Sequence, residues 1–460
     1  MSFPTILLAI FIFGVLIFIH ELGHFLAARA FGVTVLEFAI GMGPKLFSKR
    51  SKKSGTLYSI RLFPIGGYVN MLGEGANANP APAPKKDLEN EIERDPLIQN
   101  LEDTEAAQKA AAEEDLHSYS KQKVWKRIVI SLAGPMMNLL LGFALMFLLV
   151  ILSGTSTLGG TTVAGFFTQY SAEESAYGLE TGDYLETLDG KQIRSYGQLE
   201  AAIDESDDGV LIADLTVTRL NKEQTAYETV TLFGVRLTKE FLASSFTGSV
   251  SESTGLRSDD IIKKVNGIPV HTYNELSYEI MMQGYRPLDL TVERDGKRIT
   301  LEKVAFPNFT DESGKIALGE MDFRIYREEN PGLFIILKHA FFRSLSTVKM
   351  VWDSIGGLLT GRFGFESISG PVGITKTISD TAKTGSLNLL YLVIVISINL
   401  GIMNLLPLPA LDGGHIFFHL IEGVRGKPIK PEVEAIINFV GLVLLLALAV
   451  IVSIKDVISL

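Results

Sequence analysis

The chain has 460 residues and a formal net charge of −10, and 47% of its residues are hydrophobic. This share and the mean hydropathy of +0.26 are high for a soluble protein and indicate membrane spans. The acidic balance offers no broad basic surface, which argues against nucleic acid as a partner. Because cysteine is absent, disulfides and thiol nucleophiles are excluded, and any metal site must be built from His, Asp and Glu.

Four segments are long and apolar enough to cross a bilayer, which takes about 20 residues. These predicted spans cover residues 4–27, 128–152, 387–408 and 434–454. The first is expected to be retained rather than cleaved, because its start is not basic and its apolar run continues to Ala30. Lysine and arginine gather after span one, before span two and between spans three and four. The positive-inside rule therefore predicts that both termini lie outside and that residues 153–386 are exported.

The first span contains the segment FIHELGHFLAAR, residues 18–29. Its histidines, His20 and His24, are four residues apart, which places both imidazoles on one face of a helix, one turn apart. Glu21 lies beside His20, where it can take a proton from a water bound to a metal that the histidines hold. Ionisable groups in a membrane-length helix are costly, so a zinc site is favoured over a chance HExxH on a wet helix face.

The loop between spans one and two has two parts. Residues 33–73 alternate apolar and polar with Gly and Pro breaks, and predict short strands of a small sheet dipping toward the membrane, with a turn at 52–55. This sheet either offers an edge to an extended peptide or only braces the loop. Residues 75–118 are rich in Pro, Glu, Asp and Ala and predict a flexible acidic insertion, with a polar helix near 102–115.

Spans two and three carry polar groups that need partners inside the protein. Span two contains Pro135 and Asn138, and Asn138 is expected to brace adjacent helices rather than to contact substrate. Span three ends in NLLPLPALDGGH, residues 404–415, where two prolines two residues apart must open the helix. Asp412 follows on a turn flanked by glycine.

The predicted depth of Asp412 in the membrane is the same as that of His20 and His24. Spans one and three run in the same direction, so both sites are expected near the cytoplasmic ends of their spans. Two histidines and one carboxylate make three protein ligands and leave a fourth tetrahedral position for water, as in catalytic zinc sites. His415, just past the glycine pair, is the competing third ligand.

The exported region contains an internal repeat, in which the segment from Gly178 aligns without gaps on the segment from Gly255. Each copy resembles a PDZ domain, with a GL–GD–I–NG–V signature followed by a helix and a strand. Such modules bind an extended chain end as an added strand. Tandem copies can also act as a size filter without a ligand, and we favour a filter or a sensor as the interpretation. The second copy has Ser258 and Asp259 where the first has Thr181 and Gly182, so its tight turn is less well defined.

Residues 332–362 mix cations with apolar residues and predict an amphipathic helix that lies at the outer surface rather than crossing. His339, within it, is expected to be a surface residue and not a metal ligand.

The motifs together carry a family resemblance. HELGH in the first span, GPMMN in the second, the PDZ-like copies and NLLPLPALDGG in the third resemble the site-2 protease family of intramembrane metalloproteases, in its bacterial regulator-of-sigma-E protease branch. Only 75–118 falls outside the resemblance. It implies zinc held by His20, His24 and Asp412, with Glu21 as general base.

The resemblance also implies a location and a substrate contact. It places the chain in the bacterial cytoplasmic (inner) membrane, and it implies that Asn404 helps to hold the substrate backbone. In the segment GGYVNM, Tyr68, Val69 and Asn70 are the candidates for further substrate contact. The family more often has Lys where this chain has Asn70, which leaves that contact in doubt.

The expected fold is a multi-pass α-helical membrane protein with four spans, a small membrane-associated β-sheet and two exported α+β PDZ-like domains. The predicted parts are, in chain order, a first span with HExxH (1–32), a β-sheet loop (33–74), a flexible acidic insertion (75–122), a second span (123–153), PDZ-like domain 1 (160–240), PDZ-like domain 2 (241–308), a linker with the interfacial helix (309–385), a third span with the LDG motif (386–416), a cytoplasmic loop (417–432) and a fourth span (433–460).

The expected activity is zinc-dependent cleavage of the transmembrane segments of single-span membrane proteins. A trimmed anti-sigma factor and signal-peptide remnants are the substrates that the resemblance implies, and exported chain ends are expected at the PDZ-like copies. Two other classes remain. A non-catalytic membrane-anchored PDZ scaffold would bind exported peptides without any metal. A metal transporter would need polar residues on several spans, whereas span four offers only Asn438.

Overall fold

The computed structural model describes residues 3–74, 117–154, 158–206, 208–221, 227–310, 317–328 and 331–458. The chain divides into two units, one formed by Met1–Leu149 with Thr347–Leu460 and the other by Val150–Ser346. The predicted acidic insertion lies outside the described residues as far as position 116, and the polar helix expected near 102–115 lies wholly outside them.

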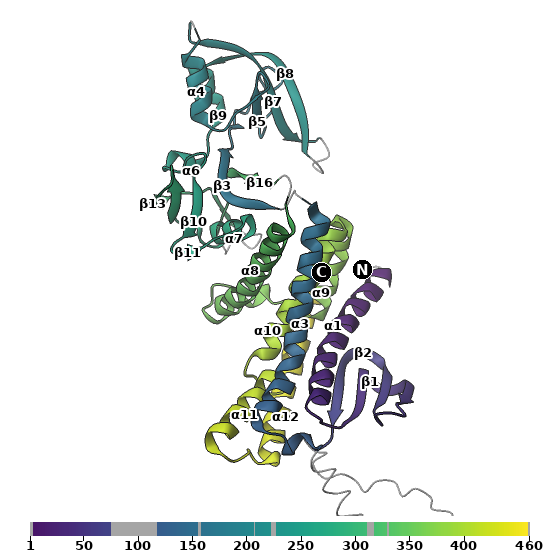
Figure 1. Cartoon of the computed structure of the whole chain (residues 1–460). Helices are drawn as coiled ribbons and strands as arrows, with labels where there is room; N and C mark the ends of the chain where they lie inside the picture. Colours follow the sequence, from purple (N-terminus) through teal and green to yellow (C-terminus); the bar gives the residue numbers. More distant parts are fainter. Residues whose placement is uncertain are drawn as a thin grey trace, which may run out of the picture. The chain divides into compact units, whose positions relative to one another are not determined.

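Four long apolar helices form the frame of the first unit (Figure 1). They are α1 (Phe3–Ala30), α3 (Val124–Ser153), α10 (Ser386–Leu405) and α12 (Pro431–Ile458). Among the described residues these are the four helices long and apolar enough to cross a membrane, which confirms the predicted spans. Between 11% and 28% of the residues in their most apolar windows are buried inside the protein. Such uniformly apolar helices are covered by lipid where protein does not cover them.

Two shorter helices, α9 (Pro371–Thr384) and α11 (Asp412–Arg425), complete the first unit. Ile378 of α9 is fully buried in a cluster with Ile12 of α1. At the start of α9, the N–H groups of Gly370 and Gly373 each donate a hydrogen bond of 2.8 Å to the carboxylate of Asp456 in α12. A carboxylate at this position caps the helix and stabilises its positive end. α9 therefore joins α1 and α12 near the two chain ends (Figure 1).

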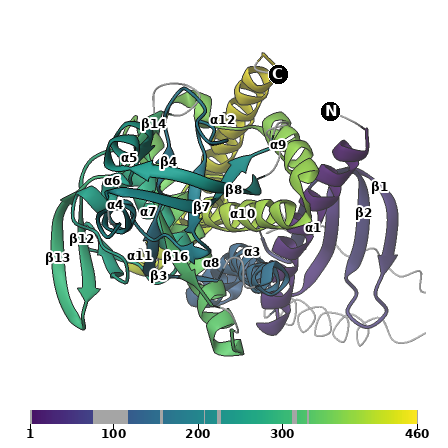
Figure 2. The same ribbon diagram turned by 90° about the horizontal axis from the view of Figure 1, so that it is seen from above.

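The strands β1 (Val35–Arg50) and β2 (Leu57–Met71) form an antiparallel hairpin. The predicted sheet of short segments is present. Residues 37–40 of β1 pair both with residues 57–60 and with residues 67–70 of β2, and residues 45–50 pair with residues 57–61. Glycines at positive φ, Gly41, Gly43 and Gly66, occur where the register shifts, so the ladder bends and continues instead of ending. In two views the hairpin lies beside α1 (Figures 1 and 2). Phe38 of β1 packs edge-on against Phe25 of α1, with ring centroids 5.3 Å apart.

The second unit contains two modules, each with its own sheet and core. We call the segment Gln169–Thr247 the inner module; its sheet order is β8-β7-β5-β4-β9. Its elements are β4 (Gln169–Tyr170), β5 (Tyr184–Leu188), β6 (Lys191–Gln192), α4 (Tyr196–Asp204), β7 (Val210–Leu220), β8 (Tyr227–Thr238), α5 (Lys239–Ser245) and β9 (Phe246–Thr247). Alternate residues of β7, Ala213, Leu215 and Val217, are buried, which is the period of a strand with one face on a core.

The outer module surrounds the inner one in sequence, and its sheet order is β13-β12-β10-β3-β16. Its elements are β3 (Gly159–Phe166), α6 (Val250–Ser253), β10 (Ile261–Val265), β11 (Ile268–Pro269), α7 (Tyr273–Gln283), β12 (Leu288–Arg294), β13 (Lys297–Val304), β14 (Asn308–Thr310), β15 (Ala317–Gly319) and β16 (Phe323–Arg327). This pairing does not follow the predicted boundaries 160–240 and 241–308. These boundaries place β3 in the first domain and β16 in the linker, whereas the two strands pair with each other, a long-range contact that local patterns cannot reveal.

The sequence repeat reappears as a repeated ion pair. Asp183 bonds Arg219 at 2.6 Å in the inner module, and Asp260 bonds Arg294 at 2.7 Å in the outer module. Both carboxylates are buried, and each also accepts a 2.9 Å hydrogen bond from a backbone N–H three residues earlier. The turn of the second copy is retained, because Asp259 adopts a φ of +68°, a left-handed conformation that Asp tolerates better than most residues.

The helix predicted at 332–362 is present as α8 (Leu333–Leu359) and is not among the candidate spans. Its position at the membrane surface stays a prediction. The expectation that His339 is a surface residue is wrong, since its exposed fraction is 4%. Burial lowers the pKa of His339. One turn away, Phe342 stacks on His271 of the outer module at 4.1 Å, so this face of α8 packs on protein rather than on water.

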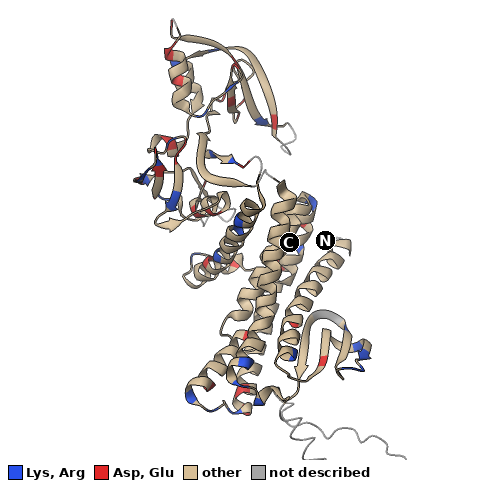
Figure 3. Cartoon of the chain, in the orientation of Figure 1, with Lys and Arg blue, Asp and Glu red and all other residues tan. Residues whose placement is uncertain are grey.

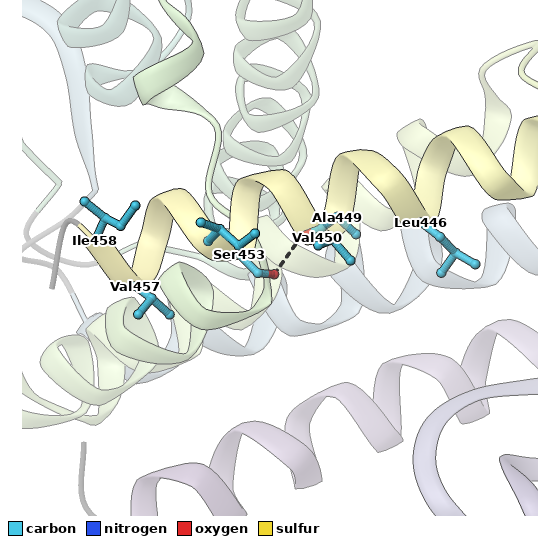
Figure 4. A pocket seen from close by; sticks show the side chains of 7 residues that line it. Leu446, Ala449, Val450, Ser453, Val457 and Ile458 are labelled. Atoms are coloured by element: carbon cyan, nitrogen blue, oxygen red, sulfur yellow. Dashed lines mark hydrogen bonds between the residues drawn. The ribbon is translucent and has the colours of Figure 1, made fainter.

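The surface of α12 carries a shallow apolar hollow, where Ala449 and Ser453 leave space between Leu446 and Val457 (Figure 4). The Ser453 hydroxyl donates to the Ala449 carbonyl at 2.7 Å. Its polarity is therefore satisfied within the helix, and the hollow can face lipid without an unpaired group. Two single-turn 3-10 helices, η2 (Tyr119–Lys121) and η4 (Phe365–Ser367), complete the described elements.

Candidate metal centre and active site

Three side chains from opposite ends of the sequence converge within the first unit. His20 and His24 lie on α1, and Asp412 is the first residue of α11. The Asp412 carboxylate lies 3.0 Å from Nε2 of His20 and 3.4 Å from Nε2 of His24, and the two Nε2 atoms are 3.3 Å apart. Among the described residues, this is the group whose ligand atoms are close enough to hold one metal ion.

These distances fit zinc. A tetrahedral zinc ion with bonds of about 2.0–2.2 Å holds its ligand atoms roughly 3.3–3.6 Å apart, close to the separations found. Two imidazole nitrogens and one carboxylate are also the donors that catalytic zinc sites use. The geometry leaves room for a single ion with three protein ligands.

Helix α3 sets the orientation of His24. Nδ1 of His24 donates to the carbonyl oxygen of Ile130 at 2.8 Å, which leaves Nε2 unprotonated and able to bind a metal. Gly134, one turn along α3, makes space for the ring. Gly23 on α1 makes space for the backbone of α3, because a Cβ at Gly23 would lie 2.3 Å from the carbonyl oxygen of Ala133. Small residues thus allow α1 and α3 to approach closely.

Asn138 faces the protein interior, as predicted. Its exposed fraction is zero, and its backbone carbonyl accepts a 2.8 Å hydrogen bond from Ser397 of α10, so it also braces two helices. The structure adds a contact that sequence reasoning missed, because the Asn138 amide lies 3.3 Å from Nδ1 of His20. The spacing of Gly134 and Asn138, four residues apart like His20 and His24, is the signal that could have revealed it.

A tight turn places Asp412. Helix α10 ends at Leu405, which confirms that the backbone opens in the proline-containing segment. The next helix begins at Asp412, and neither following glycine has room for a side chain. A Cβ at Gly413 would lie 2.1 Å from the carbonyl oxygen of Leu406, and one at Gly414 would lie 2.4 Å from that of Leu408. The two glycines are needed for the chain to fold back on itself here.

Helix α12, the fourth span, packs against this turn and supports it. Ala410 has a φ of +67°, a left-handed conformation that costs a non-glycine residue about 1–2 kcal/mol. Its N–H donates to Oδ1 of Asn438 in α12 at 3.1 Å. Gly441, one turn along α12, packs against Pro409 with no space for a Cβ, which would lie 2.4 Å away. Span four, which supplies no ligand, therefore supports the aspartate turn.

The three converging side chains line a cavity of about 160 Å³. Its wall also contains Glu21 and residues of β2, the turn after β2, α3 and α11: Gly67, Tyr68, Val69, Met71, Glu74, Ile130, Ser131 and His415. Of the predicted substrate-contact residues, Tyr68 and Val69 line the cavity, whereas Asn70 and Asn404 do not. Sequence reasoning missed Gly67, where a Cβ would lie 2.9 Å from Cγ of Glu21, so β2 passes directly over the predicted base.

His415 lies at the cavity but is engaged elsewhere. Its Nδ1 is 3.3 Å from the carboxylate of Glu434 in α12. The hydrogen bond to Glu434 raises the pKa of His415, and a protonated imidazole does not bind zinc. This pairing favours Asp412 over His415 as the third ligand.

A charged cluster stiffens β2 next to the cavity. Arg61 donates to Glu37 at 2.9 Å and to the hydroxyl of Tyr68, and Ser59 donates to Glu37 at 2.6 Å. Burial opposes ionisation of Glu37, but the hydrogen bonds from Ser59 and Arg61 outweigh it and lower the pKa of Glu37. The cluster positions the Tyr68 ring at the cavity wall.

Comparison with known proteins identifies the family of the chain. A model of Peptidase family M50 matches residues 8–448. The chain is 28% identical to "Regulator of sigma-W protease RasP" of Bacillus subtilis and 27% identical to "Probable protease eep" of Enterococcus faecalis, each over 98% of both chains. It is 30% identical to a "Putative zinc metalloprotease" of Vibrio cholerae over 92% of this chain and 91% of the relative. The chain belongs to Peptidase family M50, the site-2 protease family, and is a zinc-dependent intramembrane metalloendopeptidase.

Proposed function

We propose that this protease cleaves the transmembrane segments of single-span membrane proteins at a zinc ion held by His20, His24 and Asp412, with Glu21 as general base. One observation carries the proposal. Ligand atoms from α1 and from the start of α11 lie within 4.8 Å of one another, and Glu21 lines the same cavity.

The metal and the protein's side chains supply different parts of the hydrolysis chemistry. Zinc, when bound, polarises the scissile carbonyl and makes water acidic enough to attack near neutral pH. Glu21 takes the proton of the attacking water and then delivers it to the leaving amine. The cavity walls hold the substrate backbone so that the scissile peptide bond lies next to both the zinc site and Glu21.

Substrate presentation depends on β2. A peptide bond within a helix is shielded by its own hydrogen bonds, so the substrate helix must unwind before cleavage. In the described part of the chain, residues 67–71 of β2 pair only with residues 35–40 of β1, so the other edge of this segment can accept an extended strand. Tyr68 and Val69 at the cavity wall then contact residues next to the scissile bond. Asn70 and Asn404, outside the cavity wall, contact more distant parts of the substrate.

The charge distribution supports the proposed orientation. Most Lys and Arg of the first unit gather over α11 and the tip of the β1–β2 hairpin (Figure 3), and fewer lie near the two chain ends, where α9 carries Lys383 and α12 carries Lys455. In a bacterial cytoplasmic membrane this arrangement favours the α11 end in the cytoplasm and both termini outside. The inner and outer modules, which we propose to be PDZ-like, would then lie outside the cell and limit access by size.

A Glu21→Gln variant tests the function. It should bind zinc like the wild type, because Glu21 is not a ligand, while cleavage is lost. The membrane proteome of cells carrying the variant should accumulate fragments of single-span proteins, and their identity would separate a trimmed anti-sigma factor from signal-peptide remnants. Retained cleavage of such fragments by Glu21→Gln would remove Glu21 from the mechanism. Peptide binding by the zinc-loaded wild type without any cleavage would favour a scaffold instead.

A further inference from the structure

We propose that Asn138 is a positioning residue for His20, whose Nδ1–H it holds through its side-chain carbonyl oxygen so that Nε2 points at the metal. The inference rests on the ligand set proposed above. It assigns a task to the second span, which supplies no ligand.

The face of α3 that meets the histidines carries three contacts at four-residue spacing. The Ile130 carbonyl accepts from His24, Gly134 makes space for the His24 ring, and Asn138 reaches His20. Positions four apart lie above one another on a helix, so this row matches the histidine pair of α1. His24 is oriented by the main-chain carbonyl of Ile130, and His20 by the side chain of Asn138, two steps further along the same row.

The protonation of His20 determines which amide atom faces it. Nε2 of His20 lies 3.0 Å from Asp412 and points into the group that would hold zinc. An imidazole that binds a metal through Nε2 carries its proton on Nδ1, and Nδ1–H needs an acceptor. The Asn138 amide, 3.3 Å away, is the neighbour of Nδ1.

The unpaired atom of the amide points to the same arrangement. With Nδ2 toward His20, Oδ1 of Asn138 is buried and has no hydrogen-bond partner among the described residues. A buried acceptor without a partner destabilises the folded protein. The two ends of an amide exchange places by a half-turn. After that exchange the oxygen accepts from Nδ1–H of His20, which is the arrangement that the metal requires.

The amide accepts the hydrogen bond without adding a charge to a membrane span. A carboxylate at the same place would also accept it, as carboxylates commonly do from histidines that bind zinc. Ser397 of α10 donates to the main-chain carbonyl of Asn138 and not to its amide, so it provides a matched control.

Zinc affinity tests the proposal without depending on activity. The full-length protein would be purified in detergent, and zinc affinity measured by competition with a chromogenic chelator for wild type, Asn138→Leu, Asn138→Asp, Ser397→Ala and His20→Gln. Loss of a partner that orients a ligand typically weakens metal binding about 10–100-fold, and this loss is expected for Asn138→Leu. Asn138→Asp keeps the acceptor and should remain within a few-fold of wild type, as should Ser397→Ala.

The outcomes separate this inference from the proposed function. Wild-type affinity in Asn138→Leu would overturn the role of Asn138, as would equal losses in Asn138→Asp and Asn138→Leu. Undiminished zinc binding by His20→Gln would instead refute the ligand set itself.

A second measurement needs no Asn138 variant and covers the case in which Asn138→Leu does not fold. Nitrogen NMR of the zinc-loaded wild type with 15N-labelled histidine, assigned by comparison with His20→Gln, should show Nδ1 of His20 protonated. An unprotonated Nδ1 would contradict the proposal.

Discussion

Gly134 of α3 and His24 of α1 are packed so closely that a Cβ atom at position 134 would lie 2.2 Å from Nε2 of the imidazole. That nitrogen is one of the three atoms proposed to bind zinc. The glycine therefore holds open the space in which the ring can take its metal-binding orientation. No small shift of a flexible side chain can relieve the clash, because the ring is fixed through Nδ1 to Ile130.

Gly134→Ala should consequently displace His24 and reduce zinc binding more than it reduces helix formation. Overpacking of this kind costs about 1–3 kcal/mol, and we expect zinc affinity to fall at least tenfold. Gly14→Ala on α1 is the matched control, since a Cβ there meets nothing within 4 Å. Metal content after dialysis at fixed free zinc measures the difference, and equal zinc in both variants would contradict this account of Gly134.

Gly67→Ala should separate catalysis from metal binding. A Cβ at Gly67 would lie 2.9 Å from Cγ of Glu21 and 3.0 Å from the carbonyl oxygen of Ala39, so Glu21 must move while the proposed ligands stay. We expect normal zinc content and a loss of cleavage of more than tenfold, mostly in kcat, because a misplaced base fails in the transition state. Gly160→Ala, at an open position, should leave both unchanged. Wild-type kcat for Gly67→Ala would show that β2 does not position Glu21.

Asn438→Leu should weaken zinc binding from a distance. The substitution removes the acceptor for the strained Ala410 N–H, two residues before Asp412. A lost buried hydrogen bond is worth about 1–3 kcal/mol, so the expected fall in zinc affinity is about tenfold. Ser453→Ala, which changes another polar residue of α12 whose hydroxyl bonds only within the helix, is the control. An unaltered affinity in Asn438→Leu would mean that the turn keeps its shape without span four.

The third ligand can be identified by a pair of variants. Asp412→Asn should lose zinc, because it removes the charged donor that lies between the two histidines. His415→Ala should keep zinc, since His415 is paired with Glu434. Metal analysis of the two proteins decides between them, and the reverse result would make His415 the ligand.

The parts of the site that could be predicted are those with a local signal. Span positions follow from hydropathy, the pairing of His20 and His24 from helical spacing, and the level of Asp412 from the direction of its span. The contacts of Asn138 and Gly67 could not be predicted, because they depend on how closely separate elements pack. The prediction for His339 is wrong for a related reason. The pattern of an amphipathic helix predicts that a polar residue faces water, whereas that face of α8 packs on protein.

The interruption of the outer module has a consequence for the order of assembly during synthesis. β3 is made before the inner module, but its partner β16 follows more than a hundred residues later. All strands of the inner module are contiguous, so it can complete its sheet as soon as Thr247 has emerged. Domains generally fold in the order in which they are synthesised. The outer sheet cannot be completed until β16, which begins at Phe323, has been synthesised. A nascent chain halted before that point has a complete inner module and an outer module in which the edge of β3 that pairs with β16 is unpaired.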